Sequence, residues 1–213
     1  MIVRQIRTGG DRNFAYLVGC GESREAIVID GSFNPDLVFS MAEEAGLVIR
    51  HAFSTHGHED HTNGNFRLAE LAHCDVFLYG DRSERGGFSV LDGQIFHVGS
   101  MAVQVIHTPG HTPDSMALLA GSALFTGDTL FCGKVGGTAT EADAASEYHS
   151  LHEKLLVLPD LTVVWPGHDY GVHPSSTIGA ERRGNPFLLQ PDFGAFLELK
   201  RNWAAYKVLH GIV

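Results

Sequence analysis

The segment STHGHEDHTNGN, residues 54–65, holds three histidines and two acidic residues. Residues two apart on extended backbone point the same way, so His56 and His58 can bind one ion together. The turn into a following helix should direct Asp60 and His61 towards a second position. Neutral imidazole and carboxylate are ligands that zinc, iron and manganese accept. A lone loop histidine is more often solvated or hydrogen-bonded, but this density indicates a metal site.

Three later loops carry a histidine or an aspartate next to glycine. They are TPGHT (108–112), TGDTLF (126–131) and PGHDY (166–170), which contain His111, Asp128 and His168. Strand ends on one edge of an α/β sheet collect into a common site. We therefore expect His111 to complete the first set of ligands and His168 the second. Asp128, with two carboxylate oxygens, can bridge both ions.

Short apolar runs rich in β-branched residues alternate with helical stretches, which predicts an α/β architecture. Asn34 and Pro35 predict the start of a helix that ends at Gly46. No linker divides residues 1–213, so we expect one domain with a short C-terminal helical region. Arg82 and Arg85 belong to a polar surface loop and are better explained as part of a solvated turn than as substrate contacts. The other expected elements are strands at 13–20, 25–30, 47–54, 75–80, 101–112, 115–121, 122–131 and 161–170, and helices at 65–73, 141–159 and 191–210.

The composition narrows the class of partner. A net charge of −10 over 213 residues argues against nucleic acid, which requires clustered basic residues. No apolar run approaches the roughly 20 residues of a membrane helix, and the N-terminus lacks signal-peptide features. Three cysteines without C-x-x-C spacing indicate reduced thiols, and Cys132 is expected to be buried and inert. These observations predict a cytoplasmic protein with no nucleic-acid partner and no membrane partner.

The motif HGHEDH, residues 56–61, resembles the H-x-H-x-D-H signature of the metallo-β-lactamase-fold superfamily. The later motifs follow in the family's order over nearly the whole chain. The resemblance implies a four-layer αββα sandwich with two divalent metal ions, zinc ahead of iron and manganese, at one edge of the paired sheets. It also implies a complete set of ligands: His56, His58 and His111 on one ion, Asp60, His61 and His168 on the other, and Asp128 bridging.

Within the superfamily, the four motifs are similar to those of glyoxalase II, which hydrolyses thioesters such as S-lactoylglutathione. This similarity implies a small-molecule thioester substrate and attack by a hydroxide that bridges the metals, with Asp60 as the catalytic carboxylate that orients it or moves its proton. Tyr170 in PGHDY is implied as a substrate contact. The segment CGKVGGT, residues 132–138, departs from the family's turn, since Lys134 comes earlier and Gly137 stands where a basic residue would contact glutathione. Lys134 is the second expected substrate contact.

A neighbouring branch gives the alternative function. The segment PGHDYGVHPSSTIGAERRGNPFL, residues 166–188, is similar to persulfide dioxygenases, which use one Fe(II) held by two histidines and one aspartate. His56, His111 and Asp128 would fill those places. The arginine-bearing turn of that branch is missing here, so we predict thioester hydrolysis ahead of persulfide oxidation. A non-enzymatic metal-binding or partner-binding protein is a third alternative, and the sequence leaves the oligomeric state open.

Overall fold

The computed structural model describes residues 1–80 and 88–211, so Arg82 and Arg85 lie outside the described residues. Its centre is a pair of six-stranded sheets. The first sheet has the order β1 (Ile2–Gly9), β2 (Asn13–Gly19), β3 (Glu25–Ile29), β4 (Val48–Phe53), β5 (Asp75–Tyr79) and β6 (Phe88–Val90). The second has the order β14 (Ser176–Thr177), β13 (Val163–Pro166), β10 (Ala123–Gly127), β9 (Met116–Ala120), β8 (Met101–His107) and β7 (Ile95–Val98). Strands β11 (Leu130–Phe131) and β12 (Lys134–Val135) form a small separate ribbon.

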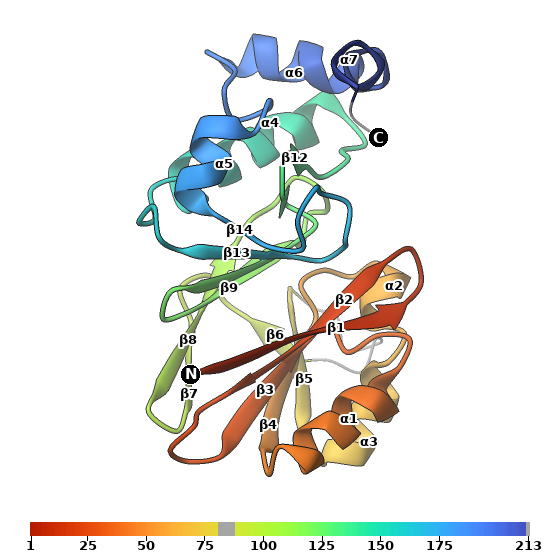
Figure 1. Ribbon diagram of the computed structural model, residues 1–213, viewed down its shortest axis with the longest axis vertical. Coiled ribbons are helices and arrows are strands. Elements are labelled where there is room, and N and C mark those ends of the chain that lie inside the picture. Colours follow the sequence, from red (N-terminus) through yellow and green to blue (C-terminus); the bar gives the residue numbers. More distant parts are fainter. Residues whose placement is uncertain (81–87, 212–213) are drawn as a thin grey trace.

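Helices cover the outer face of each sheet, as Figure 1 shows. The first sheet packs against α1 (Pro35–Glu44) and α3 (Asn65–Ala72), while α2 (Glu59–Thr62) is a single turn within the histidine-rich loop. Beyond the second sheet lie α4 (Glu141–His149) with its π-helical continuation η2 (Ser150–Leu155), α5 (Ile178–Gly184), α6 (Phe193–Arg201) and α7 (Trp203–His210). The order helix, sheet, sheet, helix confirms the predicted αββα sandwich.

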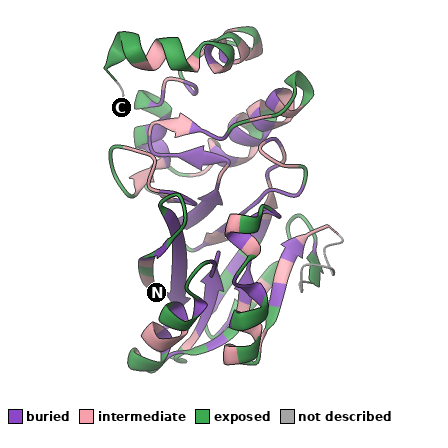
Figure 2. Ribbon diagram, turned by 90° about the vertical axis from the view of Figure 1, so that its right-hand side faces the viewer, coloured by how far each residue is buried: buried purple, intermediate pink, exposed green. Residues whose placement is uncertain are grey.

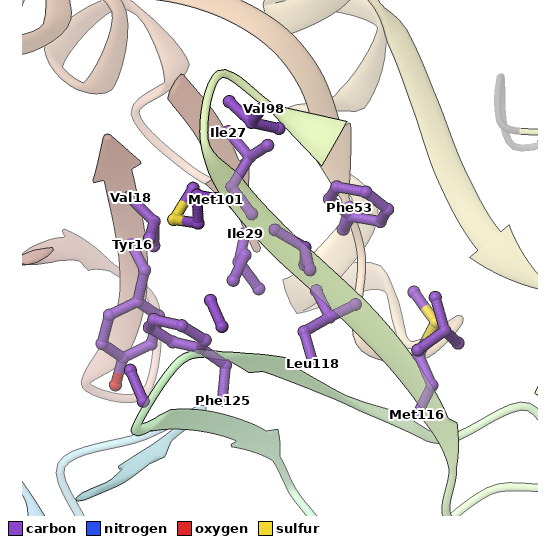
Figure 3. Packing of buried hydrophobic residues seen from close by; sticks show 14 of the residues in the cluster. Tyr16, Val18, Ile27, Ile29, Phe53, Val98, Met101, Met116, Leu118 and Phe125 are labelled. Carbon is purple, nitrogen blue, oxygen red and sulfur yellow. The ribbon is translucent and has the colours of Figure 1, made fainter. Parts of the chain in front are cut away.

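The inner faces of the two sheets form the main hydrophobic core (Figure 3). Ile27 and Ile29 of β3 face this core from one side, and Leu118 and Phe125 face it from the other, all fully buried. Complete burial of such a side chain contributes about 1.5–3 kcal/mol. Buried residues are concentrated in the sheets, whereas the helices turn exposed faces outward (Figure 2). This core fixes the two sheets against each other and so fixes the edge that carries the site.

Parallel strand pairs bring the predicted ligands to that edge. Strand β4 lies parallel to β3 and β5, so the loop after β4 begins beside the carboxyl end of β3. Strand β10 lies parallel to β13, with Gly127 opposite Pro166. A hydrogen bond of 2.8 Å from the Met116 amide to the Thr55 carbonyl connects the two sheets at this point.

Several elements differ from the sequence expectation. The elements that were not predicted are β1, β6, β7, β12, β14 and α5. The strand expected over 122–131 is divided into β10 and β11, the helix expected over 141–159 ends as η2 at Leu155, and the helix expected over 191–210 is divided at Asn202 into α6 and α7. The Asn202 side chain donates to the Glu198 carbonyl and carboxylate at 3.0 and 2.6 Å, which ends α6. In the part of the chain that the structure describes, no helix is long and apolar enough to cross a bilayer.

Candidate metal centre

The first group of predicted ligands consists of three histidines from two loops. His56 and His58 follow β4, and His111 follows β8. The His58 Nδ1 atom lies 2.9 Å from His56 Nε2 and 3.1 Å from His111 Nε2. Three ring nitrogens therefore converge on one point, and a cation can satisfy all three lone pairs at once.

The second group combines one loop histidine, one carboxylate and one histidine from the other sheet. Asp60 and His61 lie on α2, and His168 follows β13. His61 Nε2 is 3.1 Å from His168 Nε2, and Asp60 Oδ2 is 3.6 and 3.4 Å from these two nitrogens. This set of two imidazoles and a carboxylate also suits a divalent transition metal.

Asp128 lies between the two groups. Its Oδ1 is 3.5 Å from His61 Nε2, and its Oδ2 is 3.7 Å from His111 Nε2 and 3.3 Å from His168 Nε2. Oδ1 is buried and has no hydrogen-bond partner among the described residues, so the carboxylate fits a position beside cations. Burial by itself raises the pKa of Asp128, but the charge of His61 and the hydrogen bond from His168 outweigh it and hold this pKa well below its usual range.

Glycine is required where the backbone comes closest to these side chains. The Gly167 amide donates to the Gly127 carbonyl at 2.8 Å, which joins the loops after β10 and β13. A Cβ atom at Gly167 would lie 2.4 Å from Asp128 Oδ1 and 2.9 Å from His61 Cε1. Any side chain at Gly167 would therefore displace two predicted ligands.

Hydrogen bonds from the outer ring nitrogens orient the histidines. His111 Nδ1 lies 2.7 Å from the Gly137 carbonyl, and His168 Nδ1 lies 2.8 Å from the Asp11 carbonyl. Because a carbonyl only accepts, Nδ1 carries a proton in both rings, which leaves Nε2 to face the centre and to bind an ion when it is unprotonated. His61 Nδ1 faces the buried Asp30 carboxylate at 3.0 Å in the same way.

The electrostatic environment of the centre favours added positive charge. Burial and the nearby His61 charge hold the pKa of His56 well below 6.5, so His56 is a neutral ligand. Burial also lowers the pKa of His61, but the surrounding carboxylates, Asp30 first, raise it to about 9. Three carboxylates around these rings, those of Asp30, Asp60 and Asp128, make the centre attractive to cations.

Two residues that were not predicted from the sequence, Asp30 and Asn13, support the centre. Asp30, at the end of β3, also accepts hydrogen bonds from the Thr55 amide at 2.7 Å and hydroxyl at 2.9 Å. Asn13 donates to the Asp60 carboxylate at 3.0 Å and to the Asp60 carbonyl at 3.1 Å. Asp30 carried a usable signal, since it precedes glycine at a strand end like the predicted ligands.

Lys134 and Tyr170, the two expected substrate contacts, lie together beside the second group. The Tyr170 ring stacks on His168 with centroids 4.5 Å apart, and its hydroxyl donates to Asp11 at 2.7 Å. Lys134 Nζ is 4.5 Å from the centre of the Tyr170 ring, and burial lowers the pKa of this amine. Their contact with a substrate stays a prediction.

Arg182, Arg183 and Cys132 have structural environments. Arg182 and Arg183 both pair with Asp160. Cys132 is buried, and burial raises the pKa of its thiol to about 12, as expected of an inert cysteine.

Two paired sheets with a histidine and aspartate centre at their shared edge define a class of metal-binding αββα enzymes. The sequence matches the Metallo-beta-lactamase superfamily over residues 8–168. The chain belongs to this superfamily, and it is a metal-dependent enzyme of this fold.

Curated proteins with different activities are similar to this chain. The human protein "Persulfide dioxygenase ETHE1, mitochondrial" is 33% identical over 193 residues, which cover 88% of this chain and 76% of the relative. A hydroxyacylglutathione hydrolase of Polaromonas sp. is 36% identical over 180 residues, which cover 80% of this chain and 67% of the relative. The crystal structure of ETHE1 from Myxococcus xanthus has a TM-score of 0.88 at 34% identity, and the match covers 95% of this chain and 91% of that chain. The dioxygenase and the hydrolase thus have similar sequence identity to this chain.

Proposed function

We propose that the protein is a thioester hydrolase of glyoxalase II type that uses two divalent ions, zinc ahead of iron or manganese. The observation that carries this proposal is the presence of two ligand groups of three side chains each, with Asp128 between them. When bound, two such ions lower the pKa of water towards 7 and polarise a carbonyl group.

Asp60 is the residue proposed to act on the attacking water. The Asn13 amide donates to Asp60 Oδ2 at 3.0 Å, and the Asp60 side chain is 37% exposed, so its carboxylate lies beside the other ligands and is also accessible to solvent. From this position Asp60 Oδ2 can orient a water molecule and accept its proton. Asp60 thus combines the two roles of ligand and proton acceptor.

The leaving group explains why a thioester is the preferred substrate. A thiol with a pKa near 8.5 departs as thiolate with little proton assistance, whereas an amine leaving group needs a general acid. We assign the thiol portion to the side of the centre that carries Lys134 and Tyr170. The ammonium of Lys134 would attract an anionic thiol carrier there, and the Tyr170 ring, fixed by Asp11, would form one wall.

The similarity to persulfide dioxygenases in sequence and structure supports a second candidate function. In that case one Fe(II) would be held by His56, His111 and Asp128, and the protein would consume oxygen with glutathione persulfide. Elemental analysis of protein purified without added metal, together with assays on S-lactoylglutathione and glutathione persulfide, separates the two. Two ions per chain and thioester turnover support the hydrolase; one iron and oxygen uptake overturn it.

Asp128→Ala provides the sharpest single-residue test of the two-ion hydrolase. Because its carboxylate faces both ligand groups, we expect the variant to lose turnover and to retain less than the two ions of the parent. Metal content per chain and thioester hydrolysis are measured on the same preparation. A variant that keeps both ions and full activity would rule out the bridging role.

A further inference from the structure

Lys200 of α6 reaches from the outermost helical layer towards the loops of the metal centre. Its ammonium donates to the Gly136 carbonyl at 2.7 Å and pairs with the Glu147 carboxylate of α4. Glu147 is completely buried, and the Lys200 side chain is only 10% exposed. This pair is therefore a buried ion pair outside the group of predicted ligands.

Stability alone is a weak reason for such a pair. Replacing a buried ion pair by apolar residues of similar size is often neutral or stabilising. One oxygen of Glu147, Oε1, has no hydrogen-bond partner among the described residues, and burial raises the pKa of this carboxyl to about 7. The role of the pair is better sought in the backbone that it contacts.

Glu147 supports the segment that leads into His111. A Cβ atom at Gly110 would lie 2.3 Å from Glu147 Cβ and 2.4 Å from its Cα, so the backbone before His111 lies directly on this residue. Gly110 also has a φ of +148°, which favours glycine there. Three residues further along the helical segment, Ser150 donates to the Pro109 carbonyl at 2.7 Å.

Lys200 holds the segment that orients the His111 ring. The residue after its acceptor Gly136 is Gly137, whose carbonyl lies 2.7 Å from His111 Nδ1. A Cβ atom at Gly136 would lie 2.1 Å from the Asp128 carbonyl and 3.2 Å from His111 Cβ, so this loop packs against two predicted ligands. The ion pair thus contacts two segments that adjoin His111, the backbone at Gly110 and the loop at Gly136.

We propose that Lys200 and Glu147 position the His111 ring. By doing so, this pair sets the affinity of the three-histidine group for its ion. The proposal rests on the two-ion function proposed above and extends it to α6, which lies beyond the residues 8–168 that match the superfamily. Loss of the pair should affect the group of His56, His58 and His111 more than the group of Asp60, His61 and His168.

Zinc titration of the metal-free protein against a chromophoric chelator tests the proposal. In Lys200→Met we expect one of two ions to bind about tenfold or more weakly while the other is unchanged. Lys200→Arg keeps a cationic donor and should restore much of the affinity. Arg201→Met is the matched control, because Arg201 follows on the same helix and pairs with Glu141 at 2.9 Å on the exposed surface. Its two affinities should equal those of the parent.

A double variant separates positioning from the cost of an unpaired buried charge. Glu147→Gln with Lys200→Met leaves neither charge, so it tests the proposal even if Lys200→Met fails to fold. Positioning predicts that the weak ion stays weak, and recovery to the parent affinity would overturn the proposal, as would equal weakening of both ions. If the parent protein binds only one ion, the proposed two-ion hydrolase is rejected. The same variants then show whether the ion pair affects the affinity for that one ion.

Discussion

Asp30 determines which nitrogen of His61 carries the ring proton, and therefore whether Nε2 can bind an ion of the second ligand group. Its Oδ1 accepts from the Thr55 amide at 2.7 Å, and its Oδ2 faces His61 Nδ1 at 3.0 Å. In Asp30→Asn the carbonyl oxygen should stay on the Thr55 amide, so the new NH2 group faces Nδ1 and moves the ring proton to Nε2. We expect one of the two zinc affinities to fall about 10–100-fold in a competition titration.

The control for this substitution is Asp36→Asn on α1. Asp36 is exposed and bonded to Arg67 at 2.7 Å, so the same change of chemistry there should leave both affinities unchanged. Parent-like binding in Asp30→Asn would mean that another group sets the His61 tautomer.

Sequence reasoning finds residues whose own side chains carry the chemistry. The motifs of the predicted ligands combine a metal-binding side chain with glycine at a strand end, and the structure brings all seven together. Asp30 follows the same rule, but it is isolated along the chain and becomes relevant only when β3 lies beside β4. Gly136 and Gly137 act through backbone carbonyls, and a carbonyl has no residue-specific signal in the sequence.

The buried Glu147 carboxyl, which lies between α4 and α6, should make the free energy of unfolding depend on pH. The pKa of Glu147 is raised from 4.5 to about 7 by burial, which the charge and hydrogen bond of Lys200 only partly offset. The folded state therefore holds a proton that the unfolded state releases, and this contribution is complete below pH 4.5 and lost as pH rises through about 7. Relative to Glu147→Gln, the free energy of unfolding of the parent should fall by on the order of 3 kcal/mol across this window.

Urea denaturation at steps between about pH 4 and 8 provides the measurement. Glu141→Gln serves as the control, because Glu141 lies on the same helix but is exposed with its partner Arg201. If the free energies of unfolding of parent and Glu147→Gln differ by the same amount at every pH, Glu147 has the same pKa in the folded and the unfolded state, and the prediction is wrong.

Elements with strong local signals were predicted well, and those defined by tertiary contacts were not. Helix α1 follows its signals, since the Asn34 side chain accepts from the Leu37 amide at 3.2 Å and Gly46 has a φ of +63°. Strand β1 carries polar side chains between its apolar ones and, among the described strands, pairs only with β2, so no apolar run reveals this edge strand. The break at Asn202 depends on a side-chain hydrogen bond that helical periodicity does not show.

At the scale of the whole molecule, the predicted ligands come from both sheets. His56, His58, Asp60 and His61 follow β4 of the first sheet, while His111, Asp128 and His168 follow strands of the second. Alternating strands and helices indicated an α/β architecture, and the family resemblance implied the paired sheets, but the register that makes these ends meet arises from the packed core between them. Bound ions would therefore connect the two sheets in addition to that core.

Removal of metal should accordingly lower the stability of the whole fold. An ion present at 1,000 times its dissociation constant stabilises the folded state by about 4 kcal/mol, provided that the unfolded chain does not bind it. For a chain of 213 residues this corresponds to a fall in Tm of about 10 °C on chelation, restored by added zinc. Calorimetry of parent and Asp128→Ala provides the comparison, since Asp128 faces ligands from both sheets and the variant should respond less to chelator. An unchanged Tm after verified metal removal would show that the core alone holds the sheets together.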